Sequence, residues 1–344
     1  KGVFGRVAED IRVSGNGDWN VRPELKHTWK ASRFCPPSRG LGSQALPSRV
    51  CLAKQRRISA CRATGTGTCG QELKHTWKAS RFCPPLNGYN RDKFCRAVGQ
   101  RNVVFVGDQS QLALHDVFIN HVLTMKTSKE IGTAADAWEE NEIPLCHRKP
   151  HVVCSDHVPG GFTFRVVHNN LLSPDSAGGG KFNQRWLRHL REWNASIVVL
   201  NKGFEKRPTA KYLSTLRASL AKLREVAPDV LLVWRNTWRG HPDCGNAMEP
   251  LKTVPHNETK ESQWSYVVEQ NEGAKAIVKE FGGIYIDLDW SLSMRPDGHI
   301  RKLDGSMDCY YYCLPGPIDH FMRLFYNTLL LLDSKRAVSS SPQT

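Results

Sequence analysis

The chain has 344 residues, of which 40% are hydrophobic and 24% charged. This length allows one large domain or two small ones, and the composition is ordinary for a globular protein. No run of about 18 or more apolar residues occurs, so the sequence predicts no membrane span. Because the first residue is Lys1 rather than Met, we expect that a start, a signal peptide or a membrane anchor can precede this segment.

The net charge of +15 is distributed unevenly. Residues 1–100 contain 19 Lys and Arg against 6 Asp and Glu, whereas the remainder contains 29 against 27. A nucleic-acid groove places its basic residues on a folded face among aromatic side chains, and the basic excess here lies in an irregular leader. We therefore expect no nucleic-acid partner.

The cysteines and two sequons indicate the secretory pathway. None of the eleven cysteines forms a zinc-type C-x2-C pair, so we predict no metal site and expect disulfides instead. N-x-[ST] triplets begin at Asn194 and Asn257 and favour a lumenal or secreted protein, in the Golgi lumen or outside the cell. Seven cysteines lie beyond residue 71, an odd number that would leave one unpaired.

An identical segment, ELKHTWKASRFCPP, occurs at residues 24–37 and again at 72–85. Solenoid repeats diverge and recur several times, whereas this one is exact and occurs twice. The stretch between the copies has neither helical nor strand periodicity. We interpret residues 1–71 as a duplicated or mispredicted leader, with a genuine disordered basic linker as the alternative. Residues 72–332 then form the domain, and the Ser-rich residues 333–344 a frayed tail.

Strands and helices alternate from about residue 100 onward. Short apolar runs predict buried parallel strands at 102–106, 196–200, 230–234 and 284–286. Apolar residues at helical spacing predict helices at 110–125, 211–226, 266–281 and 317–332. This alternation predicts a parallel, doubly wound α/β sheet, in which ligands bind in loops at the carboxyl ends of strands.

Three segments at predicted strand ends or near the end of the chain carry candidate functional residues. The first loop contains Gly107, Asp108, Gln109, Ser110 and Gln111. A glycine there allows a tight turn, and the start of the following helix presents N–H groups to an anion. The second loop contains Asn201 and Gly203, and the third contains Asp308 and Tyr311 within DCYYYCLPG. Each alone also fits a tight turn, a strand cap or a disulfide-bonded loop.

In this order the segments resemble the PC-esterase and trichome-birefringence-like family, polysaccharide O-acetyltransferases and esterases with an SGNH-like fold. The segment from Trp77 to Cys83 is similar to the family's W-x-P…C opener, and residues 105–108 to its strand ending in G-D-S. The family's closing D-C-x-H-W-C-L-P-G-x-x-D is matched at Asp308, Cys309, Cys313, Leu314, Pro315, Gly316 and Asp319. The N-x-G loop resembles residues 199–203, and R-T-x-x-x-x-H resembles Arg235 to His241.

The resemblance implies an SGNH-like, doubly wound and mostly parallel sheet flanked by helices, with a glycan substrate and no cofactor. It implies a serine nucleophile on the first loop and a D-x-x-H pair on the third. Backbone N–H groups, Asn201 and Gly203 would stabilise the oxyanion, and Arg235 and His241 would contact substrate.

The chain departs from the family at both catalytic positions. Gln109 stands where the serine is expected, and Tyr311 where the histidine is expected. Glutamine has no hydroxyl, and tyrosine is a poor base at neutral pH. Ser110 could serve as the nucleophile only if the alignment with the family were shifted by one residue. Such a shift turns the side chain about 100° around the helix axis. His241 and His320 are alternative bases.

Three hypotheses remain: an active O-acetyltransferase or esterase, a glycan-binding pseudoenzyme, and a basic nucleic-acid-associated protein. The charge distribution argues against the third, and the two altered catalytic positions favour the second for this chain. We expect this chain to descend from the family's acyl-transfer enzymes, and we expect polysaccharide or glycoprotein glycans as its partners.

Overall fold

The computed structural model describes residues 19–21, 75–77, 86–122, 150–174, 183–203, 208–242, 244–247, 249–253, 264–301, 306–313 and 316–340. The first copy of the repeat and all but residues 75–77 of the second lie outside this part of the chain. So do Cys35, Cys51, Cys61, Cys69, Cys83, Cys146 and the sequon at Asn257.

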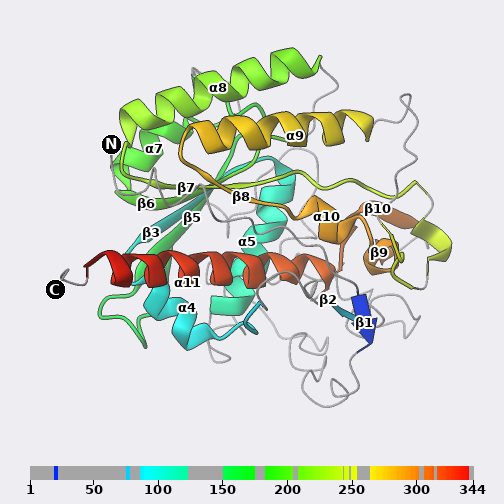
Figure 1. The fold of residues 1–344 in the computed structure, drawn as a ribbon, viewed down its shortest axis with the longest axis horizontal. Coiled ribbons are helices and arrows are strands. Elements are labelled where there is room, and N and C mark those ends of the chain that lie inside the picture. Colours follow the sequence, from blue (N-terminus) through cyan, green and yellow to red (C-terminus); the bar gives the residue numbers. More distant parts are fainter. Residues whose placement is uncertain are drawn as a thin grey trace, which may run out of the picture.

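The centre of the fold is a six-stranded sheet in the order β4-β5-β3-β6-β7-β8 (Figure 1). Its strands are β3 (Asn102–Gly107), β4 (His151–Val153), β5 (Phe162–His168), β6 (Ala195–Leu200), β7 (Leu231–Arg235) and β8 (Ile284–Ile286). All neighbouring pairs are parallel except β4 with β5. The parallel strands therefore run 2-1-3-4-5 in space, a doubly wound order whose switch point lies between β3 and β6. The predicted α/β fold class is confirmed.

Helices cover both faces of the sheet (Figure 1). On one face lie α4 (Arg91–Val98), α5 (Gln109–Val122) and α11 (His320–Ser340), and on the other α7 (Trp186–Glu192), α8 (Thr209–Val226) and α9 (Ser265–Glu280). Alternate strand residues separate the two cores, because successive side chains of a strand point to opposite faces. Val103 and Phe105 of β3 pack in the first core, and Val104 and Val106 in the second.

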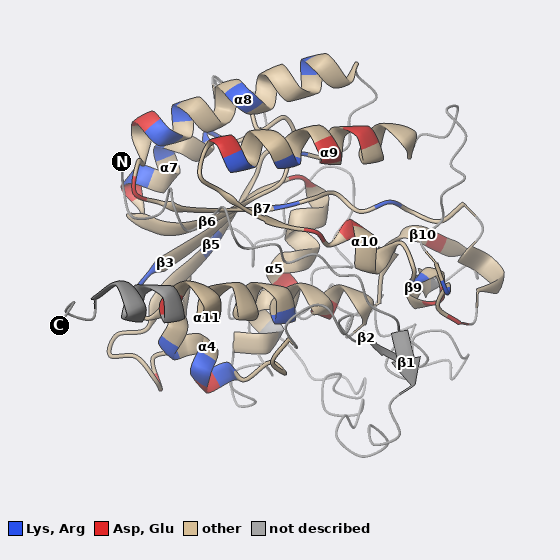
Figure 2. Cartoon of the chain, viewed as in Figure 1, with Lys and Arg blue, Asp and Glu red and all other residues tan. Residues whose placement is uncertain are grey.

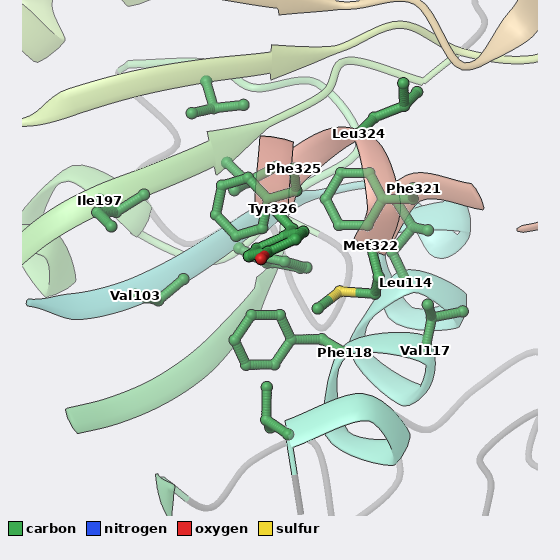
Figure 3. Close-up of a cluster of buried hydrophobic side chains, with 14 of the residues drawn as sticks. Val103, Leu114, Val117, Phe118, Ile197, Phe321, Met322, Leu324, Phe325 and Tyr326 are labelled. Carbon is green, nitrogen blue, oxygen red and sulfur yellow. The ribbon is translucent and has the colours of Figure 1, made fainter. Parts of the chain in front are cut away.

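The first core is rich in aromatic rings contributed by α5 and α11 (Figure 3). Phe118 of α5 lies 5.4 Å from Phe105 between ring centroids, and Phe321 of α11 lies 5.8 Å from Phe105, both edge to face. Such pairs add about 0.5–1.5 kcal/mol beyond the burial of their area. This packing fixes α5, whose first residue is Gln109, against the sheet.

A smaller antiparallel pair, β9 (His299–Arg301) with β10 (Met307–Tyr312), lies beside α10 (Asp289–Leu292). Short 3₁₀ turns are η4 (Cys244–Asn246), η5 (Pro296–Gly298) and η6 (Pro317–Asp319). Within the segment expected to be an irregular leader, β1 (Trp19–Val21) pairs antiparallel with β2 (His75–Trp77).

The predicted strands correspond to β3, β6, β7 and β8, and three of the predicted helices to α5, α8 and α9. The strands β4, β5, β9 and β10 and the helices α4, α7 and α10 were not predicted. The last helix begins at His320 after η6 and continues to Ser340, so it extends into the expected tail. Residues 334–338 are Ser-Lys-Arg-Ala-Val, without a Gly or Pro that would end a helix.

Figure 2 shows that the charged residues of α8 are mostly basic, whereas α9 carries both acidic and basic residues. Within the described residues, no helix is long and apolar enough to cross a membrane. Disulfides join Cys95 to Cys154 and Cys244 to Cys309, and Cys313 is also disulfide-bonded. Such bonds are typical of proteins from an oxidising compartment.

Candidate functional site

The first two candidate loops meet at the switch point between β3 and β6. The backbone N–H of Asp108 donates to Asn201 Oδ1 at 3.3 Å, and Asn201 Nδ2 donates to Asp108 Oδ1 at 3.0 Å. Parallel neighbouring strands bring their carboxyl ends to one edge, which explains why residues 93 positions apart lie in contact. The predicted convergence of the two loops therefore exists in the structure.

Two glycines make this contact possible. A Cβ added to Gly107 would overlap the side-chain amide of Asn201, and one added to Gly203 would lie 2.5 Å from Asp108 Oδ2. In both cases the added Cβ would lie closer to its neighbour than real Cβ atoms do, so any side chain at Gly107 or Gly203 would separate the two loops. The two glycines are needed for close approach of neighbouring groups.

Arg235, the last residue of β7, extends into the same site and is fully buried. Its Nη2 donates to Ser110 Oγ at 2.6 Å and lies 3.6 Å from Asp108 Oδ1, and its Nε donates to Gln111 Oε1 at 3.1 Å. Burial lowers the pKa of the guanidinium, while the nearby Asp108 carboxylate raises it. Arginine stays protonated in proteins, so Arg235 places one positive charge at the centre of the site.

Ser110 is fully buried, and its hydroxyl is bonded on two sides. Its Oγ donates to Asp108 Oδ1 at 2.5 Å and accepts from Arg235 Nη2 at 2.6 Å. A serine hydroxyl has one proton and two lone pairs, so Asp108 takes the proton and Arg235 takes one lone pair. Neither partner is an imidazole. In this arrangement Ser110 joins the loops together and presents no exposed hydroxyl to a substrate.

Gln109 precedes Ser110 as the first residue of α5 and is half-buried. Asp108 O accepts from Gln111 N, and Asp108 Oδ1 accepts from Ser110 N at 3.0 Å. The aspartate therefore caps the turn that presents Gln109, which keeps the geometry of a nucleophile loop with an amide in place of a hydroxyl.

The third loop lies next to this site. Asp308 Oδ1 accepts from the backbone N–H groups of Tyr310 and Tyr311, both at 3.1 Å, which forms a tight turn. The charges of Asp108 and Arg235 both act on the phenol of Tyr311, so the residue at the base position faces the first loop. Burial raises the pKa of Tyr311 far above its usual value, which prevents it from acting as a base near neutral pH.

Tyr310 was not predicted as a site residue, although Asp108, Arg235 and Ser110 all act on its phenol. Its ring stacks with those of Trp238 and Trp264, with centroids 5.8 and 5.6 Å away. Burial raises its pKa strongly. His299 was likewise not predicted, and Gln111 was placed in the first loop without a role. The third loop itself was marked in the sequence by Asp308, Cys309 and the Cys-Leu-Pro-Gly segment that begins at Cys313.

The two histidines considered as alternative bases are both buried. His241 contacts His299 and Ser293, and burial lowers its pKa. His320 begins α11, and burial together with the charge of Arg323 lowers its pKa to about 3.

The disulfide from Cys309 to Cys244 connects the third loop to the segment after His241. In the described part of the chain, no group of three or more His, Cys, Asp or Glu residues could hold a metal ion.

A family model matches residues 218–328, from within α8 to within α11. That family is PC-Esterase, described as a GDSL/SGNH-like acyl-esterase family found in Pmr5 and Cas1p. Residues 218–328 of this chain are therefore similar to the PC-Esterase family. The matched residues include Arg235, Asp308 and Tyr311 of the site, whereas the first two loops precede them. No curated protein matches the sequence.

Several solved structures are similar to this chain. One is the periplasmic domain of a lipopolysaccharide acetyltransferase from Salmonella ser. Paratyphi A, with 12% identity, 68% of this chain and 86% of that chain covered, and a TM-score of 0.39. Another is an acetyl-xylooligosaccharide esterase from Geobacillus, with 12% identity, 67% and 94% covered, and a TM-score of 0.38. At such identities and TM-scores, neither likeness assigns a substrate to this chain.

Proposed function

We propose that this PC-esterase-like domain has lost, or nearly lost, acyl transfer and binds a glycan without turning it over. The observation that carries the proposal is the Ser110 hydroxyl, which is fully buried and bonded to Asp108 and Arg235 with no histidine among its partners. Gln109 at the nucleophile position and Tyr311 at the base position support the same conclusion. A site with neither nucleophile nor base supplies binding groups alone.

The glycan is proposed from the chemistry of the family and of the site. The loops combine half-buried polar groups, such as the Gln109 amide, with the rings of Tyr310 and Trp264. The similar structures named above act on lipopolysaccharide and on acetylated xylo-oligosaccharides. We propose a polysaccharide or glycoprotein glycan as partner, reached in the secretory pathway, either in the Golgi lumen or after secretion. A preceding membrane anchor is compatible with this placement.

A second candidate function, residual O-acetyltransferase or esterase activity, is favoured by one contact. The 2.5 Å hydrogen bond from Ser110 Oγ to Asp108 would allow this carboxylate to accept the serine proton. Ser110 would then have to break its bond with Arg235 and become exposed before it could attack an ester.

Affinity electrophoresis of the full chain through gels containing acetylated or deacetylated xylan tests binding. We expect retardation by at least one polysaccharide without release of acetate. Gln109→Ala should weaken retention about threefold to tenfold, because one hydrogen bond is worth about 0.5–1.5 kcal/mol. The matched control is Gln100→Ala, an exposed residue that bonds Pro159 O, and it should bind as the parent does. Absence of retention across a broader glycan panel would contradict binding, and acetate release by the parent would favour the second candidate.

A further inference from the structure

Two buried histidines lie in contact beside the third loop. Nδ1 of His241, in the segment after β7, is 2.7 Å from Nε2 of His299, the first residue of β9. The outer nitrogens face backbone carbonyl oxygens: His241 Nε2 is 2.8 Å from Ser293 O, and His299 Nδ1 is 2.9 Å from Tyr311 O. The pair thus connects the end of α10 to the residue at the base position.

The number of protons that this chain of contacts accepts follows from the chemistry of its atoms. A carbonyl oxygen only accepts, so both outer ring nitrogens must carry hydrogen. Two neutral imidazoles have two N–H groups in total, which leaves the inner nitrogens facing each other as lone pairs. One additional proton completes the inner hydrogen bond. A second additional proton would direct two N–H groups at each other across 2.7 Å.

We propose that His241 and His299 act as one positioning unit for residues 308–313, and that this unit holds the segment only while the two rings share at most one additional proton. His299 holds the Tyr311 carbonyl, and the backbone N–H of His241 donates to Cys309 O at 2.8 Å. The unit thus fixes the segment at two positions. This inference goes beyond the proposed function, because it holds whether or not the site turns over substrate.

The charged and titratable groups around the pair supply no net negative charge for a second proton. Arg239 is paired with Asp289 at 3.1 Å, and Asp297 with Arg295 at 2.8 Å, so both carboxylates are already neutralised. The ring of Tyr312 stacks on the ring of His299, with 4.3 Å between their centroids.

The direction of the pH effect follows from burial and mutual repulsion. Burial lowers the pKa of His241, and burial together with the charge of His241 lowers that of His299 to about 3. The unfolded chain has ordinary histidines with a pKa of about 6.5. A depressed folded pKa means that the closed arrangement is fully stable above about pH 6.5 and loses stability as the pH falls toward 3. Acidification therefore releases the segment.

Hydrogen exchange of the full chain, measured at pH 7, 5.5 and 4 and corrected for intrinsic rates, tests the unit. The protection of residues 306–313 relative to β3 and β6 should fall by at least about tenfold from pH 7 to pH 4. In His299→Gln, the side-chain NH2 group has two hydrogens, one for Tyr311 O and one for the Nδ1 lone pair of neutral His241, and no second imidazolium can form. The loss of protection on acidification should therefore be clearly smaller than in the parent. His189→Gln, a histidine on α7 beside Glu192, should behave as the parent.

The proposal would be overturned if His299→Gln and the parent lost protection equally on acidification. It would also be overturned if the protection of the parent did not change with pH. Should His299→Gln not fold, imidazole ¹⁵N NMR of the parent gives an independent result. We expect both outer nitrogens to be protonated, and the two rings to titrate in separate steps below the usual histidine range. Two independent titrations near pH 6.5 would contradict the shared unit.

Discussion

Arg235 Nη2 donates a hydrogen bond to Ser110 Oγ at 2.6 Å, between the end of β7 and the start of α5. Both side chains are fully buried, and Asp108 completes the contact from the other side of the hydroxyl. This relationship gives Ser110 a structural role and places a cation directly beside its hydroxyl.

Ser110→Ala should destabilise the protein by about 1–3 kcal/mol, because it removes the hydroxyl that accepts from the buried Arg235 Nη2 and donates to Asp108. Urea unfolding measures the effect. The matched control is Ser214→Ala, an exposed serine of α8 whose hydroxyl bonds only Lys211 O, and its midpoint should not move. Equal midpoints for both variants would show that the Ser110 contacts contribute nothing to stability.

Arg235→Lys should be more damaging, at about 3–5 kcal/mol, because a buried charge loses its fixed partners. An ammonium cannot reproduce the planar geometry with which the guanidinium contacts Ser110, Gln111 and Asn236 O together. Thermal unfolding compares it with Arg217→Lys, which alters an exposed pair with Glu280 and should leave the midpoint unchanged. A fully stable Arg235→Lys protein would refute the assigned network.

Gly203→Ala should separate the first two loops, since its Cβ would overlap the carboxyl group of Asp108. We expect a loss of about 1–3 kcal/mol, typical of overpacking at a site without room. Gly245→Ala is the control, because no atom lies within 4 Å of the added Cβ. If both variants unfold at the parent's midpoint, the close contact between Gly203 and Asp108 is not required.

Asp289 predicts a pH dependence opposite in sign to that of the histidine pair. Burial raises its pKa to about 6, so the folded protein holds a proton that the unfolded chain has already released above about pH 4. Its contribution to stability therefore decreases as the pH rises from about 4 to 6, by about 1–3 kcal/mol. Urea midpoints of Asp289→Asn should lack this decrease, whereas those of Asp229→Asn, at an exposed position, should retain it.

Much of the sheet could be predicted from the sequence, because its buried strands are continuous apolar runs. The runs at residues 102–106 and 196–200 coincide with β3 and β6, whose ends create the switch point. β5 was missed because Thr163, Arg165 and His168 interrupt its apolar residues. Its parallel pairing with β3, which no local pattern reveals, buries it.

The site could be predicted as a set of loops, and its internal contacts could not. The glycines and Asn201 follow from strand ends, and the departures at Gln109 and Tyr311 are visible by their residue types alone. The role of Ser110 depends on Arg235, which lies 125 residues away in the chain. The pairing of His241 with His299 depends on how β9 and β10 fold beside α10, a tertiary arrangement without a sequence signal.

Ester turnover is the most direct test of the central claim that this PC-esterase-like domain lacks a working nucleophile and base. The measurement compares hydrolysis of p-nitrophenyl acetate by the full chain, by Ser110→Ala, and by the double variant Gln109→Ser with Tyr311→His. We predict that the parent and Ser110→Ala are equally inactive and that the double variant gains activity, because the loops already hold both positions against Asp108 and Arg235. Turnover by the parent that Ser110→Ala abolishes would contradict the claim and identify Ser110 as the nucleophile.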